Sequence, residues 1–127
     1  MGIRTKEQQM AQAAFERVQG RSSGLEFEVY SSFALAFPSL VHSCGLAQAL
    51  AFAQAKGRAD YLSDLENVLG EDVGENGCGE LCTRSREAEL MEYMRLSRRA
   101  LAASSWIKRY CQAKDCQVED CQVEGGD

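Results

Sequence analysis

Proline, histidine and β-branched residues are scarce in this chain of 127 residues. It has one proline, one histidine, two isoleucines, two threonines and seven valines, against 16 alanines and 12 leucines. Alanine and leucine lose little side-chain freedom in a helix, whereas β-branched residues favour strands. The composition therefore argues against a β-sandwich, a β-barrel or a doubly wound sheet. The hydrophobic content of 45% argues against wholesale disorder, and the length suits one domain.

The single histidine, His42, excludes a catalytic pair of histidines and a zinc site with several histidines. His42 and Cys44 are two residues apart, and such residues point in different directions on a helix, so they do not form a nucleophile and its base. The chain contains neither a glycine-rich phosphate loop nor a dinucleotide fingerprint. We therefore predict no enzyme activity, no cofactor and no small-molecule ligand.

The six cysteines lack the spacing of a metal site. Cys78 and Cys82 are separated by three residues, and no second pair follows with the spacing of a zinc ribbon. Cys111, Cys116 and Cys121 recur every five residues, a period that fits neither a helix nor a strand. These spacings predict no structural metal. The first twenty residues do not resemble a signal peptide, so we expect a cytoplasmic location, where cysteines stay reduced.

Residues 29–55 carry no charged side chain. Pro38 near the middle and the high share of alanine argue against a membrane-spanning helix. The stretch fits better as the buried centre of a helical domain, or as a surface that partner subunits cover.

Apolar residues at three- and four-residue steps predict an all-α fold, a single-domain antiparallel bundle of about five helices over residues 1–114. We expect Pro38 to separate the second helix from the third, and Gly45 to lie inside the third at a close helix crossing. Residues 70–82 contain four glycines and are expected to form a loop. The expected helices cover about 4–19, 27–37, 38–56, 58–69, and from residue 83 or 85 to about 113. The expected apolar positions are Ile3, Met10, Ala14 and Val18 on the first helix, and Tyr61, Leu62, Leu65, Val68 and Leu69 on the fourth. The last helix is expected to have a wide apolar face that includes Leu90, Met94 and Tyr110.

The sequence after residue 114 repeats the pentapeptide DCQVE and contains five acids but no base. Two copies of so short a unit do not make a repeat fold, so we predict a disordered acidic tail over residues 115–127. A flexible tail of this length reaches roughly 20 Å, enough to lie back over the cations that precede it.

The net charge of −5 hides a basic segment, because residues 95–114 contain six cations and no acid. These cations would follow one another along the last expected helix. Arginines around an aromatic ring suit a phosphate backbone and an unstacked base, although they also suit the solvated outer face of any bundle helix. On a helical wheel, one arc of about 100° contains Arg95, Arg98, Arg99, Trp106 and Arg109.

Two blocks of sequence resemble a known family. The first contains YSSF at 30–33, FPSL at 37–40, CGLAQALAF at 44–52 and Lys56, and the second is WIKRY at 106–110. With their surroundings, 29–69 and 90–114, they resemble the small α-helical subunit of the Cmr effector complex, the type III-B CRISPR machine that targets RNA.

The resemblance implies a non-catalytic, RNA-contacting structural subunit of antiviral defence. Copies of it would stack along the groove that holds guide RNA paired with target RNA. Its expected partners are both RNAs, other Cmr subunits and further copies of itself, with no membrane.

The family's Lys-Arg pair carries over to Lys108 and Arg109. The helical wheel alone adds Arg95, Arg98 and Arg99 as RNA-binding residues and Trp106 as a stacking residue. The alternative is a helical adaptor that binds another protein through the uncharged surface of 29–55 and does not contact RNA.

Overall fold

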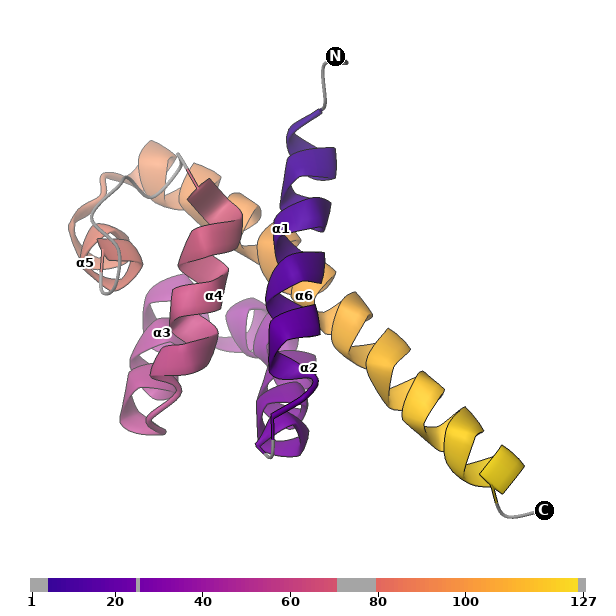
Figure 1. The fold of residues 1–127 in the computed structure, drawn as a ribbon. Helices are drawn as coiled ribbons and strands as arrows, with labels where there is room; N and C mark the ends of the chain where they lie inside the picture. The colour runs from indigo at the N-terminus through magenta and orange to yellow at the C-terminus, as the bar shows by residue number, and fades with distance from the viewer. Residues whose placement is uncertain (1–4, 25, 71–79, 126–127) are drawn as a thin grey trace.

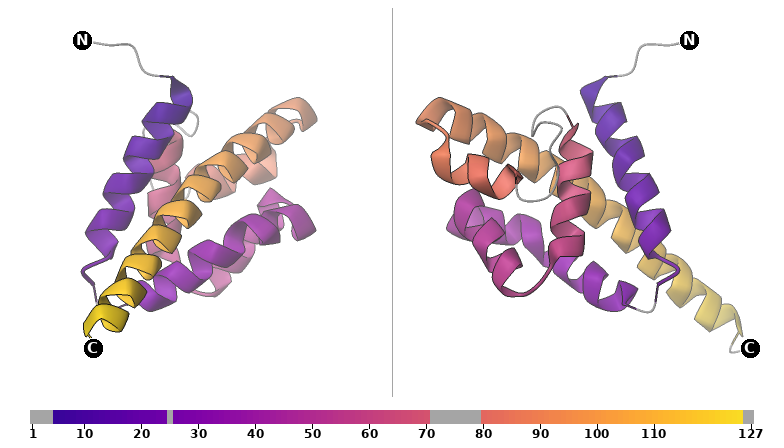
Figure 2. Two further views of the ribbon diagram at one scale, coloured as in Figure 1. Left: turned by 90° about the vertical axis from the view of Figure 1, so that its right-hand side faces the viewer. Right: turned by 60° about the vertical axis from the view of Figure 1, so that its left-hand side comes forward.

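The computed structural model describes residues 5–24, 26–70 and 80–125, which form six helices and no strand. The helices pack together around one core (Figures 1 and 2). The predicted all-α class is confirmed for these residues, although there are six helices rather than five. The helices are α1 (Lys6–Arg21), α2 (Phe27–Cys44), α3 (Leu46–Ala55), α4 (Ala59–Leu69), α5 (Glu80–Glu87) and α6 (Leu90–Gly125).

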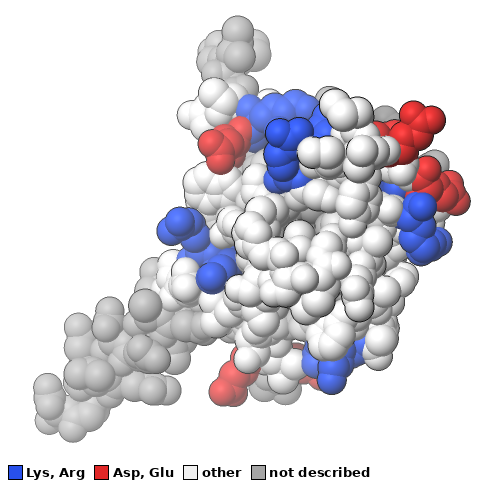
Figure 3. Space-filling view, turned by 180° about the vertical axis from the view of Figure 1, so that it is seen from behind, with Lys and Arg blue, Asp and Glu red and all other residues white. Residues whose placement is uncertain are grey.

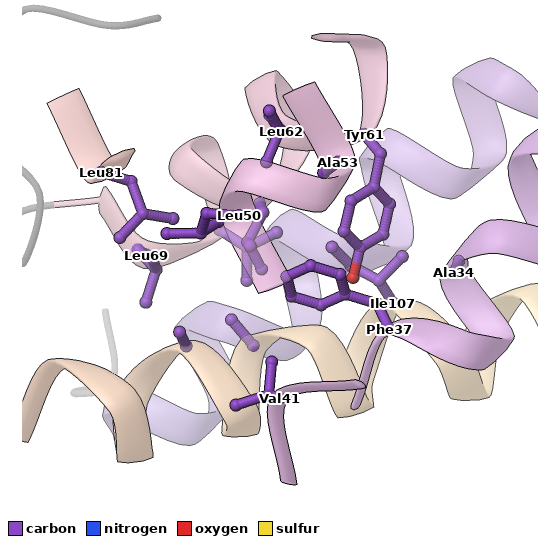
Figure 4. Close-up of a cluster of buried hydrophobic side chains, with 14 of the residues drawn as sticks. Ala34, Phe37, Val41, Leu50, Ala53, Tyr61, Leu62, Leu69, Leu81 and Ile107 are labelled. Carbon is purple, nitrogen blue, oxygen red and sulfur yellow. The ribbon is translucent and has the colours of Figure 1, made fainter. Parts of the chain in front are cut away.

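The core takes its side chains from all six helices (Figure 4 shows part of it). Of the apolar positions expected on the first helix, Met10, Ala14 and Val18 are buried, and Ile3 lies outside the described residues. The face expected on the fourth is also buried, and it consists of Tyr61, Leu62, Leu65, Val68 and Leu69. No helix in the described ranges is both long enough and apolar enough to cross a membrane.

The chain breaks at Gly45 and not at Pro38, so the predicted boundary between the second and third helices is wrong. Pro38 lies inside α2, where it is buried in the core with Phe37. This burial offsets the backbone hydrogen bond that proline cannot make. Gly45 has φ 86° and ψ 161°, a conformation that is open to glycine almost alone.

The expectation that Gly45 lies inside the third helix at a close helix crossing is wrong, because Gly45 lies between α2 and α3 and a Cβ atom there would make only an ordinary van der Waals contact. A Cβ atom added to Gly45 would lie 3.4 Å from the hydroxyl oxygen of Tyr93 on α6. That oxygen accepts a hydrogen bond from the backbone N–H of Ala47 at 3.1 Å. The first N–H groups of a helix have no partner within it, so Tyr93 completes the N-terminus of α3.

The last part of the chain folds as two helices where one was expected. Residues 80–87 form α5, so the predicted loop over 70–82 is wrong at its end, and its residues 71–79 lie outside the described residues. The main helix, α6, begins at Leu90 and not at residue 83 or 85. The N–H of Ala88 still bonds to the carbonyl of Arg84, which closes α5 just before the chain turns.

The helix α6 continues to Gly125, so the predicted end near residue 113 is wrong, and 115–125 is helical where we expected disorder. Extending a packed helix fixes one residue for each new hydrogen bond and needs no new nucleus. The repeated DCQVE units contain neither proline nor glycine to stop this extension. The end of α6 projects from the other helices and does not fold back over them (Figure 1). The division of the chain into 1–114 and 115–127 stays a prediction.

The arrangement is not wholly antiparallel. Helices α1 and α4 run in opposite directions, as do α2 and α6, but α1 and α6 run in the same general direction (Figures 1 and 2). Low residue numbers of α1 accordingly meet low numbers of α6, since Lys6 lies with Arg99 and Phe15 with Tyr110. We call this boundary between α1 and α6 the α1–α6 seam.

A buried carboxylate joins α1, α2 and α4. Asp64 is fully buried, and its Oδ2 accepts hydrogen bonds from the Tyr30 hydroxyl at 2.5 Å and from the Arg21 Nε at 3.0 Å. Its Oδ1 accepts from a terminal nitrogen of Arg21 at 3.2 Å and faces Arg17 at 3.7 Å. Burial and the bond to Asp64 raise the pKa of Tyr30 well above its usual range, so its hydroxyl remains a donor.

Replacing Tyr30 with phenylalanine should lower the free energy of unfolding by about 1.5–3 kcal/mol, because it removes one hydrogen bond from a buried charge. Tyr61→Phe is the matched control. Its hydroxyl is also buried but has no hydrogen-bond partner within the described residues, so its loss should be neutral or stabilising. Urea unfolding of both variants measures the difference, and equal losses would contradict this role of the Asp64 cluster.

Replacing Gly45 with alanine should lower the free energy of unfolding by about 1–3 kcal/mol, because alanine is strained in this backbone conformation. The control is Gly20→Ala in α1, where a Cβ atom meets nothing within 4 Å and alanine should stabilise the helix by about 0.5–1 kcal/mol. Thermal unfolding should move the two melting temperatures in opposite directions. A Gly45→Ala protein as stable as the parent would show that α2 can continue into α3 without a break.

Candidate nucleic-acid interface

Three of the predicted arginines lie exposed along α6. Arg95, Arg98 and Arg109 are exposed, and Arg99 is half-buried at the α1–α6 seam. Arg95 and Arg109 are 14 residues apart, which corresponds to about 21 Å along the helix. We call these four side chains the arginine ridge.

Lys108 does not belong to the arginine ridge. It is nine residues from Arg99, which places it about 180° around the helix axis, and it is half-buried. The structure thus separates the two residues of the Lys108–Arg109 pair: Arg109 lies with the ridge, and Lys108 lies on the other flank of α6.

Trp106 is less available than the helical wheel suggested. It is half-buried against the core, and one face of its indole is stacked on Tyr110, with ring centroids 6.0 Å apart and an interplanar angle of 21°. Tyr110 also meets the ring of Phe15 from α1 edge to face, at 5.5 Å and 74°. We call Phe15, Trp106 and Tyr110 the aromatic cluster.

Sequence reasoning identified neither Phe15 nor Tyr110 as part of the site. Tyr110 was placed on the apolar face of the last helix. Phe15 lies next to the buried Ala14 but outside the buried positions 10, 14 and 18 of α1, and it is 42% exposed. A large aromatic residue off the buried stripe of an amphipathic helix was the available signal.

Two hollows lie along the α1–α6 seam. A hollow of about 200 Å³ lies between α1 and the end of α4, and both Lys6 of α1 and Arg99 of α6 line it. A shallow groove of about 520 Å³ lies at the aromatic cluster and is lined by Gln8, Ala11, Gln12, Phe15 and Tyr110. Lys6 is a further cation that the wheel of α6 could not include, because it comes from another helix.

The cations of the seam already make contacts within the protein. Lys6, Arg95 and Arg99 each have at least one such interaction. A guanidinium group carries five N–H donors and an ammonium group three, so one protein contact leaves donors for a phosphate oxygen.

A second surface carries almost no charge. Figure 3 shows a broad area without charged side chains on the side away from the viewer of Figure 1, with lysines and arginines near its edges. Leu90 and Met91 at the start of α6 are 71% and 76% exposed, and Met94 is also exposed. The sequence had placed Leu90 and Met94 on a buried face, which is wrong for both. Their exposure suits contact with another protein.

The chemistry of the described residues is sparse. Within 5–24, 26–70 and 81–114, no three histidine, cysteine, aspartate or glutamate side chains come together as metal ligands. Cys44, Cys82 and Cys111 form no disulfide within the described residues, and Cys82 and Cys111 are buried. Cys78 lies outside the described residues.

Comparison with known proteins gives consistent matches. Residues 6–114 match the family described as CRISPR-associated protein (Cas_Cmr5). The chain is 41% identical over 111 residues to the CRISPR system Cmr subunit Cmr5 of Thermus thermophilus, an alignment that covers 87% of this chain and 96% of the relative. The crystal structure of a Cmr5 family protein from the same organism superposes with a TM-score of 0.80 at 42% identity, over 87% of this chain and 97% of the other.

Proposed function

The chain belongs to the Cas_Cmr5 family and is a small subunit of a CRISPR Cmr complex, and from this membership and its surface we propose that it is an RNA-contacting structural subunit. In this proposal, copies of it stack along the groove where guide RNA pairs with target RNA, in the cytoplasm and in antiviral defence. It carries no catalytic activity of its own.

The arginine ridge is the observation that carries the RNA contact. Residues 95–114 have six cations and no acid, and Arg95, Arg98 and Arg109 are exposed along one helix. A row of cations neutralises phosphates and releases the counterions that surround a nucleic acid. Such contacts position a strand without reading its bases, so we expect no sequence specificity.

The uncharged surface supports contacts with protein neighbours. Leu90, Met91 and Met94 form a small apolar patch at the start of α6, and α2 has no charged side chain after Glu28. Burial of such residues between subunits would provide the association that a stacked assembly requires.

The same surface favours the second candidate function, in which the chain is an adaptor that binds protein partners and does not contact RNA. The two functions differ in what the arginine ridge does. If the chain is only an adaptor, the ridge is a solvated helix face, and its neutralisation leaves every interaction intact.

Replacing Arg95, Arg98 and Arg99 together with alanine should weaken the binding of the full-length chain to single-stranded RNA by at least about tenfold at about 50 mM salt. The slope of log affinity against log salt concentration should fall by about 2, since each phosphate contact on a single strand contributes about 0.7. Fluorescence anisotropy with a labelled RNA measures both quantities.

The matched control removes three cations elsewhere, through Lys56→Ala, Arg58→Ala and Arg86→Ala. It has the same net charge and should keep both affinity and salt slope close to those of the parent. If the ridge variant binds as tightly as the parent, or if both variants lose the same affinity, RNA contact by the ridge is refuted and the adaptor function is favoured.

Replacing Met91 and Met94 with glutamine should weaken association with Cmr subunits, because it removes apolar side chains from the patch without changing the charge beside Arg95 and Arg98. The affinity of the isolated chain for RNA should change less than about threefold, since the ridge is intact. Co-purification with tagged Cmr subunits gives the first readout and anisotropy the second. Undiminished co-purification would show that the neighbours bind elsewhere.

A further inference from the structure

We propose that the groove lined by Gln8, Ala11, Gln12, Phe15 and Tyr110 is a slot for an unstacked base of single-stranded RNA. The proposal rests on the RNA contact proposed above and adds to it a site on α1. The arginine ridge would position phosphates, whereas this slot would receive a base from the same strand.

The exposure of Phe15 is the first observation. The buried stripe of α1 consists of Met10, Ala14 and Val18, and Phe15 points away from it with 42% of its surface exposed. A single exposed apolar residue is ordinary. Phe15, however, is in contact with Tyr110, which itself stacks on Trp106, so three aromatic rings from two helices meet at one exposed place.

The shape of the groove fits a flat ring. The edge-to-face arrangement of Phe15 and Tyr110 at 74° makes the two rings adjoining walls rather than one flat stack. The groove of about 520 Å³ is shallow and open to solvent, so a base would lie against these rings with its other face exposed. A nucleobase offers a π-face to such walls whichever base it is, so stacking here would tolerate any sequence.

The polar side chains of the groove fit a base edge. Gln8 and Gln12 each bring a carbonyl oxygen and an NH₂ group. The carbonyl oxygen of Gln8 accepts a hydrogen bond from the N–H of Thr5 at 2.8 Å, and its NH₂ group can still donate. Amides carry no charge, so they neither repel nor select the phosphates on either side.

Cations lie on both sides of the groove along the seam. Lys114 follows Tyr110 by one helical turn on the same side of α6, whereas Arg109 points about 100° around the helix from Tyr110, toward the rest of the ridge. In the other direction, the Lys6–Arg99 hollow lies about 16 Å away, the length of the 11 residues from Arg99 to Tyr110. A strand with its phosphates at these cations would bring a base to the aromatic cluster.

The test compares Phe15→Leu, which removes the ring but keeps an apolar side chain, with Phe15→Tyr, which keeps the ring. The control is Phe52→Leu on α3, an aromatic residue of nearly equal exposure outside the seam. Each full-length protein is titrated with an oligouridine of about 12 nucleotides, a length within the site sizes of proteins that bind single strands along a groove. An abasic strand of the same length is titrated in parallel. The readouts are affinity at about 50 and about 200 mM salt and the fluorescence of Trp106, the one tryptophan of the chain.

We expect Phe15→Leu to weaken oligouridine binding between about 5-fold and about 100-fold, the range for loss of one stacked base. The factor should be the same at both salt concentrations, because stacking is not a charge interaction. Phe15→Tyr and Phe52→Leu should stay within about twofold of the parent, since neither removes a ring from the slot. Phe15→Leu should leave the affinity for the abasic strand unchanged. The fluorescence of Trp106 should be quenched by oligouridine and not by the abasic strand.

Three results would overturn the slot. If the parent binds oligouridine and Phe15→Leu binds it equally well, the slot is refuted while the RNA contact of the ridge stands. If Phe15→Leu weakens the abasic strand as much as oligouridine, Phe15 acts through packing and not through a base. A parent chain that binds neither strand would refute the proposed function and the slot together. Circular dichroism confirms that each variant is folded.

Discussion

The arrangement of these helices depends on one carboxylate that is removed from water. Asp64 in α4 is acceptable in the core only because Arg21 of α1 and Tyr30 of α2 supply three hydrogen bonds to it. These bonds fix α1 against α4 and α2, and the position of α1 against α6 then creates the seam that holds both hollows. The first motif of the segment that resembles the family begins at Tyr30. The hydrogen bond from Tyr30 to Asp64 gives a structural reason for a tyrosine at this position.

The all-α class and the buried faces of α1 and α4 could be predicted, because they follow from helical periodicity within one segment. The predictions that are wrong concern positions where contacts between helices determine the helix boundary or the exposure of a side chain. Pro38 ends a helix in isolation, but its burial beside Phe37 keeps it inside α2. At the break, the N-terminus of α3 takes its hydrogen-bond partner, Tyr93, from α6, 48 residues after Gly45 in the chain. The exposure of Leu90 and Met94 likewise follows from where the other helices end, not from their own spacing.

The candidate site was predicted in part for the same reason. A helical wheel treats one helix at a time, so it grouped Arg95, Arg98, Arg99 and Arg109 on α6 as the structure does. It could not assign Lys6 or Phe15, which α1 brings to the seam from about 90 residues earlier in the sequence. Nor could it predict that Tyr110 would cover one face of Trp106. The contacts between helices, and not the residues within one, complete this interface.

The helical continuation of α6 has an electrical consequence. Six cations over 95–114 and five acids over 115–127 follow one another along and just beyond a single rod. Its 36 residues span about 54 Å. The rod therefore carries a large permanent dipole moment, with its positive half against the protein body and its negative end projecting outward (Figure 1). In the field of a polyanion, such a molecule experiences a torque that turns the acidic end away and presents the seam first, before any contact has formed.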